Sequence, residues 1–283
     1  GDMAAYGRSK LILASWPTLR SAVVNTDDAF GLEFQAQVQS RNVECISVGR
    51  SADAVCRIMN VGHQAHGQRI EVTSSSGAVQ IDTAVIGSFN ADNMALVFAT
   101  LLQLGHSADK VVNALKNVTP APGRMQHIEG QPAVVVDYAH TPDALEKTIQ
   151  ALRPFADKRK GKLWVVFGCG GDRDRSKRPL MGAVAAGHAD CVVVTSDNPR
   201  SENPQDILNE ILAGIDKTHS DKVVAEVDRV RAIEHAISKA NAEDVVLLAG
   251  KGHEDTQTIG KQVIAHSDAQ CAASILAKRG AHA

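Results

Sequence analysis

Asp197, Asn198 and Arg200 belong to one short stretch, Asp197-Asn198-Pro199-Arg200, whose side chains can bind both charged groups of an amino acid. An arginine offers a planar fork to a carboxylate, an aspartate accepts from an ammonium group, and an asparagine amide does both. The stretch follows an apolar run at residues 191–195, where open α/β sheets place their ligand sites. For these four residues alone, a turn that caps the next helix is the alternative. The neighbouring motifs favour an amino-acid site.

A glycine-rich stretch, Gly168 to Asp174, follows the apolar run at residues 163–167. Its glycines allow backbone N–H groups to approach an anionic ligand closely. Arg173 stands where a dinucleotide-binding fingerprint has its third glycine, which disfavours a nicotinamide cofactor. Arg173 and Arg200 follow successive predicted strands, so we expect both guanidinium groups to converge on one carboxylate. Two solvated arginines are the alternative.

Two more loops follow predicted strands. In Gly250-Lys251-Gly252-His253-Glu254, glycine permits close approach and Glu254 can accept from an ammonium group; no phosphate-binding G-x-x-x-x-G-K-[ST] sequence occurs in the chain. In the loop from Asp137 to Pro142, Asp137 suits ribose hydroxyls and His140 lies near a helix N-terminus. A capping aspartate and a packed histidine are the alternatives there.

Short β-branched runs alternate with amphipathic stretches after Pro132, which predicts a parallel sheet with crossover helices. The predicted strands are residues 133–137, 163–167, 191–195, 223–227 and 244–248. Thr141-Pro142 and Asn203-Pro204 predict helix starts, each with a cap followed by proline. We interpret this half as a Rossmann-like, doubly wound α/β domain.

The first half has a different pattern. We predict helices at 3–13, from 28, at 90–104 and from 107 to 115, strands at 22–24 and 43–48, and a hairpin of residues 70–73 and 79–85. The Pro/Gly-rich stretch 119–123 is the best linker candidate. We therefore predict two domains, 1–122 and 123–283.

Composition narrows the class of ligand. A formal charge of -2 and 4% aromatic residues disfavour nucleic acid, and no apolar run reaches the ~20 residues of a membrane span. Five cysteines without disulfide or zinc spacing indicate a reducing compartment. We expect a cytoplasmic protein that binds small molecules.

The sequence resembles the Mur ligases of peptidoglycan synthesis along its whole length, and within that family the members that add meso-2,6-diaminopimelate. The resemblance rests on blocks in the family's order: Gly1-Asp2-Met3 with Lys10, Asn25 to Asp28, Gly87 to Asn90 with Asn93, Gly123 to Met125, Asp137 to Pro142, Gly168 to Asp174, Asp197 to Arg200, and Gly250 to Glu254. It implies an α/β chain made of a partial central ATPase domain followed by a Rossmann-like C-terminal domain.

The resemblance also implies site residues. The residues implied to bind meso-diaminopimelate are Arg173, Asp197, Asn198, Pro199, Arg200, Gly250 and Glu254. Lys10 matches a carbamylated lysine that helps to hold Mg²⁺. Those implied to line the nucleotide are Asn25, Asn93, Arg124, Asp137 and His140.

The implied activity is amide-bond formation. In the family, ATP phosphorylates the D-glutamate carboxylate of UDP-N-acetylmuramoyl-L-alanyl-D-glutamate, and the diaminopimelate amine attacks the acyl phosphate. The family's phosphate-binding loop falls upstream of Gly1, so we expect a truncated chain that is inactive alone and part of a monomeric enzyme when intact. A non-catalytic amino-acid or peptide-binding module is the alternative; folylpolyglutamate synthetase, a related ligase, does not account for the Asp197–Arg200 stretch.

Overall fold

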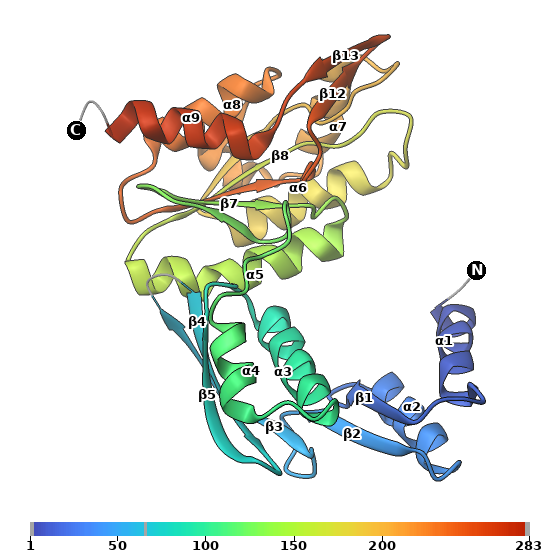
Figure 1. Cartoon of the computed structure of the whole chain (residues 1–283). Helices are drawn as coiled ribbons and strands as arrows, with labels where there is room; N and C mark the ends of the chain where they lie inside the picture. The colour runs from blue at the N-terminus through green and yellow to red at the C-terminus, as the bar shows by residue number, and fades with distance from the viewer. Residues whose placement is uncertain (1–2, 65–66, 281–283) are drawn as a thin grey trace. The chain divides into compact units, whose positions relative to one another are not determined.

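The structure is a computed structural model that describes residues 3–64 and 67–280. The chain divides into two compact units, Gly1–Thr119 and Pro120–Ala283, and both are α/β, as predicted (Figure 1). Gly1 and Asp2 of the first motif lie outside the described residues. No helix in the described ranges has the length and apolarity to cross a membrane.

The first unit is built on a five-stranded sheet in the order β1-β2-β3-β4-β5. The strands are β1 (Ser21–Asn25), β2 (Glu44–Gly49), β3 (Cys56–Gln64), β4 (Gly67–Ser74) and β5 (Gly77–Thr83). The first three run parallel, and β3, β4 and β5 pair antiparallel. The predicted strands and hairpin are confirmed. The sequence analysis missed β3, because polar residues and a glycine interrupt its apolar alternation.

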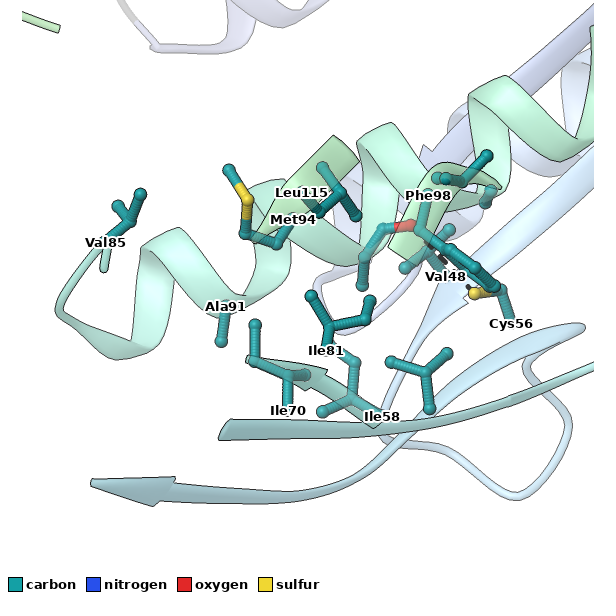
Figure 2. Packing of buried hydrophobic residues seen from close by; sticks show 14 residues of the cluster. Val48, Cys56, Ile58, Ile70, Ile81, Val85, Ala91, Met94, Phe98 and Leu115 are labelled. Atoms are coloured by element: carbon teal, nitrogen blue, oxygen red, sulfur yellow. Dashed lines mark hydrogen bonds between the residues drawn. The ribbon is translucent and has the colours of Figure 1, made fainter. Parts of the chain in front are cut away.

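Helices of the first unit pack on this sheet and on one another. They are α1 (Met3–Leu11), α2 (Ala29–Gln39), α3 (Ser88–Gln103) and α4 (Ala108–Leu115), with the 3-10 helix η1 at Ile12–Ser15. α3 contacts β1 to β4, and α4 contacts β5. Figure 2 shows Met94 and Phe98 of α3 above Ile58, Ile70 and Ile81 of the sheet, all buried. Fully burying such a side chain contributes about 1.5–3 kcal/mol, so this layer holds the unit together.

The second unit is built on a six-stranded sheet in the order β10-β9-β8-β11-β7-β6. The strands are β6 (Gln126–Ile128), β7 (Ala133–Asp137), β8 (Leu163–Phe167), β9 (Cys191–Val194), β10 (Val223–Ala225) and β11 (Val245–Ala249). Only the short β6 is antiparallel to its neighbour in this sheet. The five strands predicted in this half are confirmed, with ends that differ by at most two residues. β6 was not predicted.

Helices lie on both faces of the second sheet. They are α5 (Pro142–Arg159), α6 (Lys177–His188), α7 (Pro204–Leu212), α8 (Arg229–Lys239) and α9 (Asp268–Gly280), with the 3-10 helix η2 at Lys217–Lys222. α5, α6 and α7 pack in a row on one face, and α8 packs with α9 on the other (Figure 1). Thr141 and Asn203 cap α5 and α7 as predicted, accepting from Ala144 N at 3.3 Å and Gln205 N at 2.9 Å. This is the doubly wound arrangement expected from the sequence.

A hairpin that the sequence did not reveal follows β11. It consists of β12 (Thr256–Ile259) and β13 (Gln262–Ala265). Every residue of β13 is exposed, so the hairpin shows no apolar pattern. The hairpin binds the backbone of Arg200 through two hydrogen bonds: Arg200 N donates to Thr258 O at 3.0 Å, and Gly260 N donates to Arg200 O at 2.6 Å. The hairpin thereby holds the loop that follows β9.

Candidate functional site

The candidate site lies where neighbouring parallel strands of the second unit end together. Phe167 pairs with Val194, and Leu248 pairs with both Val166 and Val136, so the loops after β7, β8, β9 and β11 leave the same edge of the sheet. These loops enclose a cavity of about 500 Å³. Its lining is Tyr138, His140, Thr141, Gly170, Arg173, Asp174, Lys177, Asp197, Asn198, Arg200, Gly250 and Glu254.

The cavity brings together six of the seven residues proposed from the sequence for an amino-acid pocket. Pro199 is the exception. It is buried behind the lining, and its carbonyl accepts from Glu202 N at 3.0 Å. Pro199 therefore shapes the turn and does not contribute to the cavity wall.

Two guanidinium groups form one side of the cavity. Arg200 donates from Nη1 to Gly171 O at 2.7 Å, and its φ of 51° lies in the left-handed region. A methyl group at Gly170 would lie 2.9 Å from Arg200 Nη1 and 3.6 Å from Arg173 Cγ. The two arginines therefore flank the same glycine, in a position to share one carboxylate.

Acidic and amide groups form another side. Asn198 donates from Nδ2 to Glu254 Oε2 at 2.8 Å, and its Oδ1 accepts from Thr258 N at 3.0 Å. Asp197 is 9% exposed, and its Oδ1 lacks a hydrogen-bond partner among the described residues. Glu254 keeps 33% of its side chain exposed. This side is suited to a ligand ammonium group.

Gly250 allows the loop after β11 to turn into the cavity. Its φ of +108° is a conformation that other residues rarely adopt, and its N–H donates to Asp137 O at 3.1 Å. A side chain at this position would strain the turn that leads to Glu254.

A buried arginine of α6 fixes the loop after β8. Arg178 is fully buried, binds both carboxylate oxygens of Glu202 at 2.8 and 2.9 Å, and donates to Gly170 O at 3.2 Å. Glu202 in turn accepts from Asp172 N at 2.6 Å. The hydrogen bonds from Arg178 and the Asp172 backbone lower the pKa of Glu202 to about 2. This network joins the two loops that carry the cavity's arginines.

A second buried arginine lies beneath the loops after β9 and β11. Arg229 binds Asp268 through two hydrogen bonds of 2.6 and 2.8 Å, and donates to Ser196 O at 3.1 Å and Ala249 O at 3.0 Å. His266 Nε2 lies 2.8 Å from Asp268 Oδ1. Burial by itself raises the pKa of the Asp268 carboxyl, but the charge and hydrogen bonds of Arg229 outweigh it and hold that pKa well below its usual value.

This pair predicts acid sensitivity. The pKa of Asp268 in the folded state lies below the unfolded value of about 3.9, so the ion pair stabilises the fold fully above that value. This contribution is lost progressively as the pH falls from there through the folded-state pKa. We expect the urea midpoint of the chain to fall between about pH 5 and pH 3. In the Asp268→Asn variant, whose baseline stability is lower, the midpoint should fall less over the same range. Equal slopes in the two proteins would contradict the prediction.

The predicted nucleotide residues of the second unit lie at the end of β7. The guanidinium of Arg124 lies 4.8 Å from the ring centre of Tyr138, and the His140 ring meets the same ring edge-on at 4.6 Å. Asp137 is 7% exposed, and its oxygens accept from Met125 N and Ala139 N at 2.9 Å and from Thr148 Oγ1 at 3.3 Å. Asp137 therefore already organises its own loop.

The predicted residues of the first unit come from three elements, α1, β1 and α3. Lys10 is exposed on α1, with Nζ 5.3 Å from the ring centre of Tyr6. Asn25 ends β1 and accepts from Asp27 N at 2.8 Å, and Asn93 donates to Asn90 Oδ1 at 3.3 Å on α3. Within the described ranges, no group of three or more His, Cys, Asp or Glu residues is arranged to hold a metal ion.

The sequence analysis missed two lysines of the site. Lys177 lines the cavity and donates to His140 O at 2.8 Å. Lys251 is buried beneath it, in contact with Asn198 and Glu254. Lys177 stands in a run of charged residues, and Lys251 stands between two loop glycines. Neither pattern distinguishes a functional lysine from a solvated one.

Comparison with known proteins gives consistent matches. The Mur ligase middle domain matches residues 1–101, and the Mur ligase, glutamate ligase domain matches residues 123–252. The chain is 46% identical over 280 residues to the UDP-N-acetylmuramoyl-L-alanyl-D-glutamate–2,6-diaminopimelate ligase of Acidovorax sp. (strain JS42), covering 98% of this chain and 56% of that protein. The corresponding ligase of Ralstonia nicotianae is 42% identical over 293 residues, with 100% and 56% covered. The chain thus spans about 56% of the length of these relatives.

Solved structures agree with this result. A UDP-N-acetylmuramoyl-L-alanyl-D-glutamate–2,6-diaminopimelate ligase superposes with a TM-score of 0.73 at 34% identity, covering 99% of this chain and 57% of that one. Mycobacterium tuberculosis folylpolyglutamate synthase shares the fold, with a TM-score of 0.69 at 20% identity and coverage of 97% and 59%. With both family domains matched in order, and relatives similar along nearly its whole length, this chain belongs to the Mur ligase family.

Proposed function

We propose that the chain forms the amino-acid-binding part of an ATP-dependent ligase that adds meso-2,6-diaminopimelate to UDP-N-acetylmuramoyl-L-alanyl-D-glutamate. The observation that carries the proposal is the charge pattern of the cavity, with Arg173 and Arg200 on one side and Asp197 and Glu254 on another. This pattern is complementary to the carboxylate and ammonium groups of an amino-acid end. The relatives named for diaminopimelate addition support the choice of substrate.

In this proposal the distal amino-acid end of diaminopimelate occupies the cavity. Arg173 and Arg200 bind its carboxylate, and Asp197, Asn198 and Glu254 bind its ammonium group. Lysine lacks the distal carboxylate, so the arginines would favour diaminopimelate over lysine. Residues 123–283 would be the amino-acid-binding domain, and residues 1–122 would be the later part of the central ATPase domain.

The nucleotide and metal assignments are part of the same proposal. Arg124 and His140 offer a cation and a ring edge beside Tyr138, which suits a nucleotide, whereas Asp137 acts through the loop that it organises. Asn25 and Asn93 would add amide contacts. Lys10 is exposed, so its amine is accessible to CO₂. A Lys10 carbamate would contribute an oxygen ligand to Mg²⁺. A cytoplasmic, monomeric enzyme fits this chemistry.

The first test is a calorimetric titration of the chain with meso-diaminopimelate, beside L-lysine. We expect Arg200→Ala to weaken diaminopimelate binding by about 10- to 100-fold, because hydrogen bonds to charged groups contribute about 1.5–3 kcal/mol. The matched control is Arg231→Ala, which removes an exposed arginine of α8 and should leave binding unchanged. Equal binding of lysine and diaminopimelate, or an unaffected Arg200→Ala variant, would contradict the proposal.

The alternative function is a non-catalytic module that binds an amino acid or peptide, which the same cavity would also serve. ADP release that requires both diaminopimelate and the UDP-linked dipeptide separates the two functions. It should be measured on this chain and on a longer protein that joins the chain to the N-terminal part of a relative. Binding without turnover in both proteins would favour the module.

A further inference from the structure

We propose that Lys251 is a positioning residue that prepares the ammonium-binding side of the cavity. The inference rests on the proposed function and extends it to a residue beneath the cavity wall. Lys251 is 0% exposed. Its Nζ lies 3.1 Å from Glu254 Oε2, 3.2 Å from Asn198 Oδ1 and 3.5 Å from Asp197 Oδ1.

Two of these contacts, to Glu254 and Asn198, are hydrogen bonds, and the third, to Asp197, is an ion pair. An ammonium group has three N–H donors and no acceptor, and three acceptors of the cavity wall surround this one. Because Lys251 is fully buried behind these three side chains, a ligand in the cavity does not reach its ammonium group. Its effect on a ligand must pass through Asp197, Asn198 and Glu254.

Lys251 also fixes the orientation of the Asn198 amide. Asn198 Oδ1 accepts from both Lys251 Nζ and Thr258 N, so its Nδ2 faces Glu254 Oε2 at 2.8 Å. An amide rotated by half a turn would place its NH₂ group against the lysine ammonium. The lysine thus decides which polar atoms of Asn198 and Glu254 remain available to the cavity.

The charges on this side favour one ligand cation. Asp197 and Glu254 each carry one negative charge, and Lys251 carries one positive charge, which leaves a local net charge of -1. Lys177 and Asp174 also line the cavity, and their charges cancel. The ammonium group of one ligand would neutralise this net charge of -1. Without Lys251, two carboxylates would stand close together with no cation between them, and the wall would rearrange.

The test compares two ligands on the full chain. meso-Diaminopimelate carries ammonium and carboxylate groups, whereas pimelate carries only the carboxylates. We expect Lys251→Met to weaken diaminopimelate binding at least about tenfold and to change pimelate binding less than about twofold. Arg200→Ala should weaken both ligands. The matched control is Lys261→Met, an exposed lysine of the β12–β13 turn, which should weaken neither.

A ligand-free measurement separates this inference from the proposed function. In NMR spectra, the side-chain amide of Asn198 should be ordered in the native chain and in Lys261→Met, and mobile in Lys251→Met. Absence of diaminopimelate binding by the native chain would count against the proposed function and leave this readout intact. An ordered Asn198 amide in folded Lys251→Met, or equal weakening of both ligands, would overturn the role of Lys251.

A second variant keeps the inference testable if Lys251→Met does not fold. Lys251→Gln keeps an amide donor while removing the charge, and it should also lose diaminopimelate selectively. If neither variant folds while Lys261→Met does, Lys251 serves the stability of the fold and the positioning role is wrong.

Discussion

Arg229→Met should destabilise the second unit by about 3–5 kcal/mol, the range observed when one partner of a buried ion pair is removed. Arg229 is 1% exposed and Asp268 is fully buried, so the variant leaves an uncompensated carboxylate in the interior. It also removes the guanidinium N–H groups that donate to Ser196 O and Ala249 O. Urea unfolding followed by circular dichroism measures the change.

Arg231→Met is the control for this variant, because Arg231 lies on the same helix and is exposed. It should change the free energy of unfolding by less than about 0.5 kcal/mol. If Arg229→Met unfolds at the same urea concentration as this control, the buried pair does not stabilise the unit. The two carbonyls directly precede Asp197 and Gly250, so a weakened Arg229 should also loosen the cavity.

We expect Gly171→Ala to disrupt the cavity while leaving most of the fold in place. Gly171 N donates to Asn198 O at 2.9 Å, and a methyl group on Gly171 would lie 1.9 Å from Pro199 O and 2.7 Å from Pro199 C. Backbone atoms cannot rotate away as a side chain can, so the loops after β8 and β9 must separate. Overpacking typically costs about 1–3 kcal/mol, and we expect the upper end of that range because the added methyl group meets backbone atoms. We expect diaminopimelate binding to fall at least about a hundredfold.

The control for Gly171→Ala is Gly187→Ala. Gly187 lies in α6, where an added methyl group meets no atom within 4 Å. Alanine in a helix is favoured over glycine by about 0.8–1.0 kcal/mol, so this variant should be as stable as the native chain or slightly more so, with unchanged binding. Titration and urea unfolding of both variants test the comparison. Native affinity in Gly171→Ala would show that the loop contact is not required.

The strands that position the site follow directly from local sequence. Residues 133–136, 163–167 and 245–248 are continuous apolar stretches, because parallel strands covered on both faces meet no solvent. Turn and cap residues mark where they end, and each loop after them carries polar groups. That combination was sufficient to predict that Arg173, Arg200 and Glu254 belong to one edge of the sheet.

The β12–β13 hairpin and β3 show where local patterns fail. β13 is exposed along its length, and β3 mixes polar and apolar residues, so neither has the alternation that identifies a strand. The hairpin is nevertheless what fixes the Arg200 backbone through Thr258 and Gly260. Backbone hydrogen bonds of this kind use N–H and C=O groups that all residues except proline carry, so the side-chain sequence does not reveal them.

The sequence by itself determined the α/β class, the order of the strands along the chain and the polar loops at their ends, since periodicity and turn chemistry are local properties. Only the tertiary structure decided that Pro199 lies behind the wall, that Lys251 lies buried between Asp197, Asn198 and Glu254, and that Arg178 and Arg229 hold the loops from below. The positions of Lys251, Arg178 and Arg229 depend on contacts between residues 20 or more positions apart. Burial of a charged side chain is stable only when such distant partners surround it, and a single sequence does not record which partners those are.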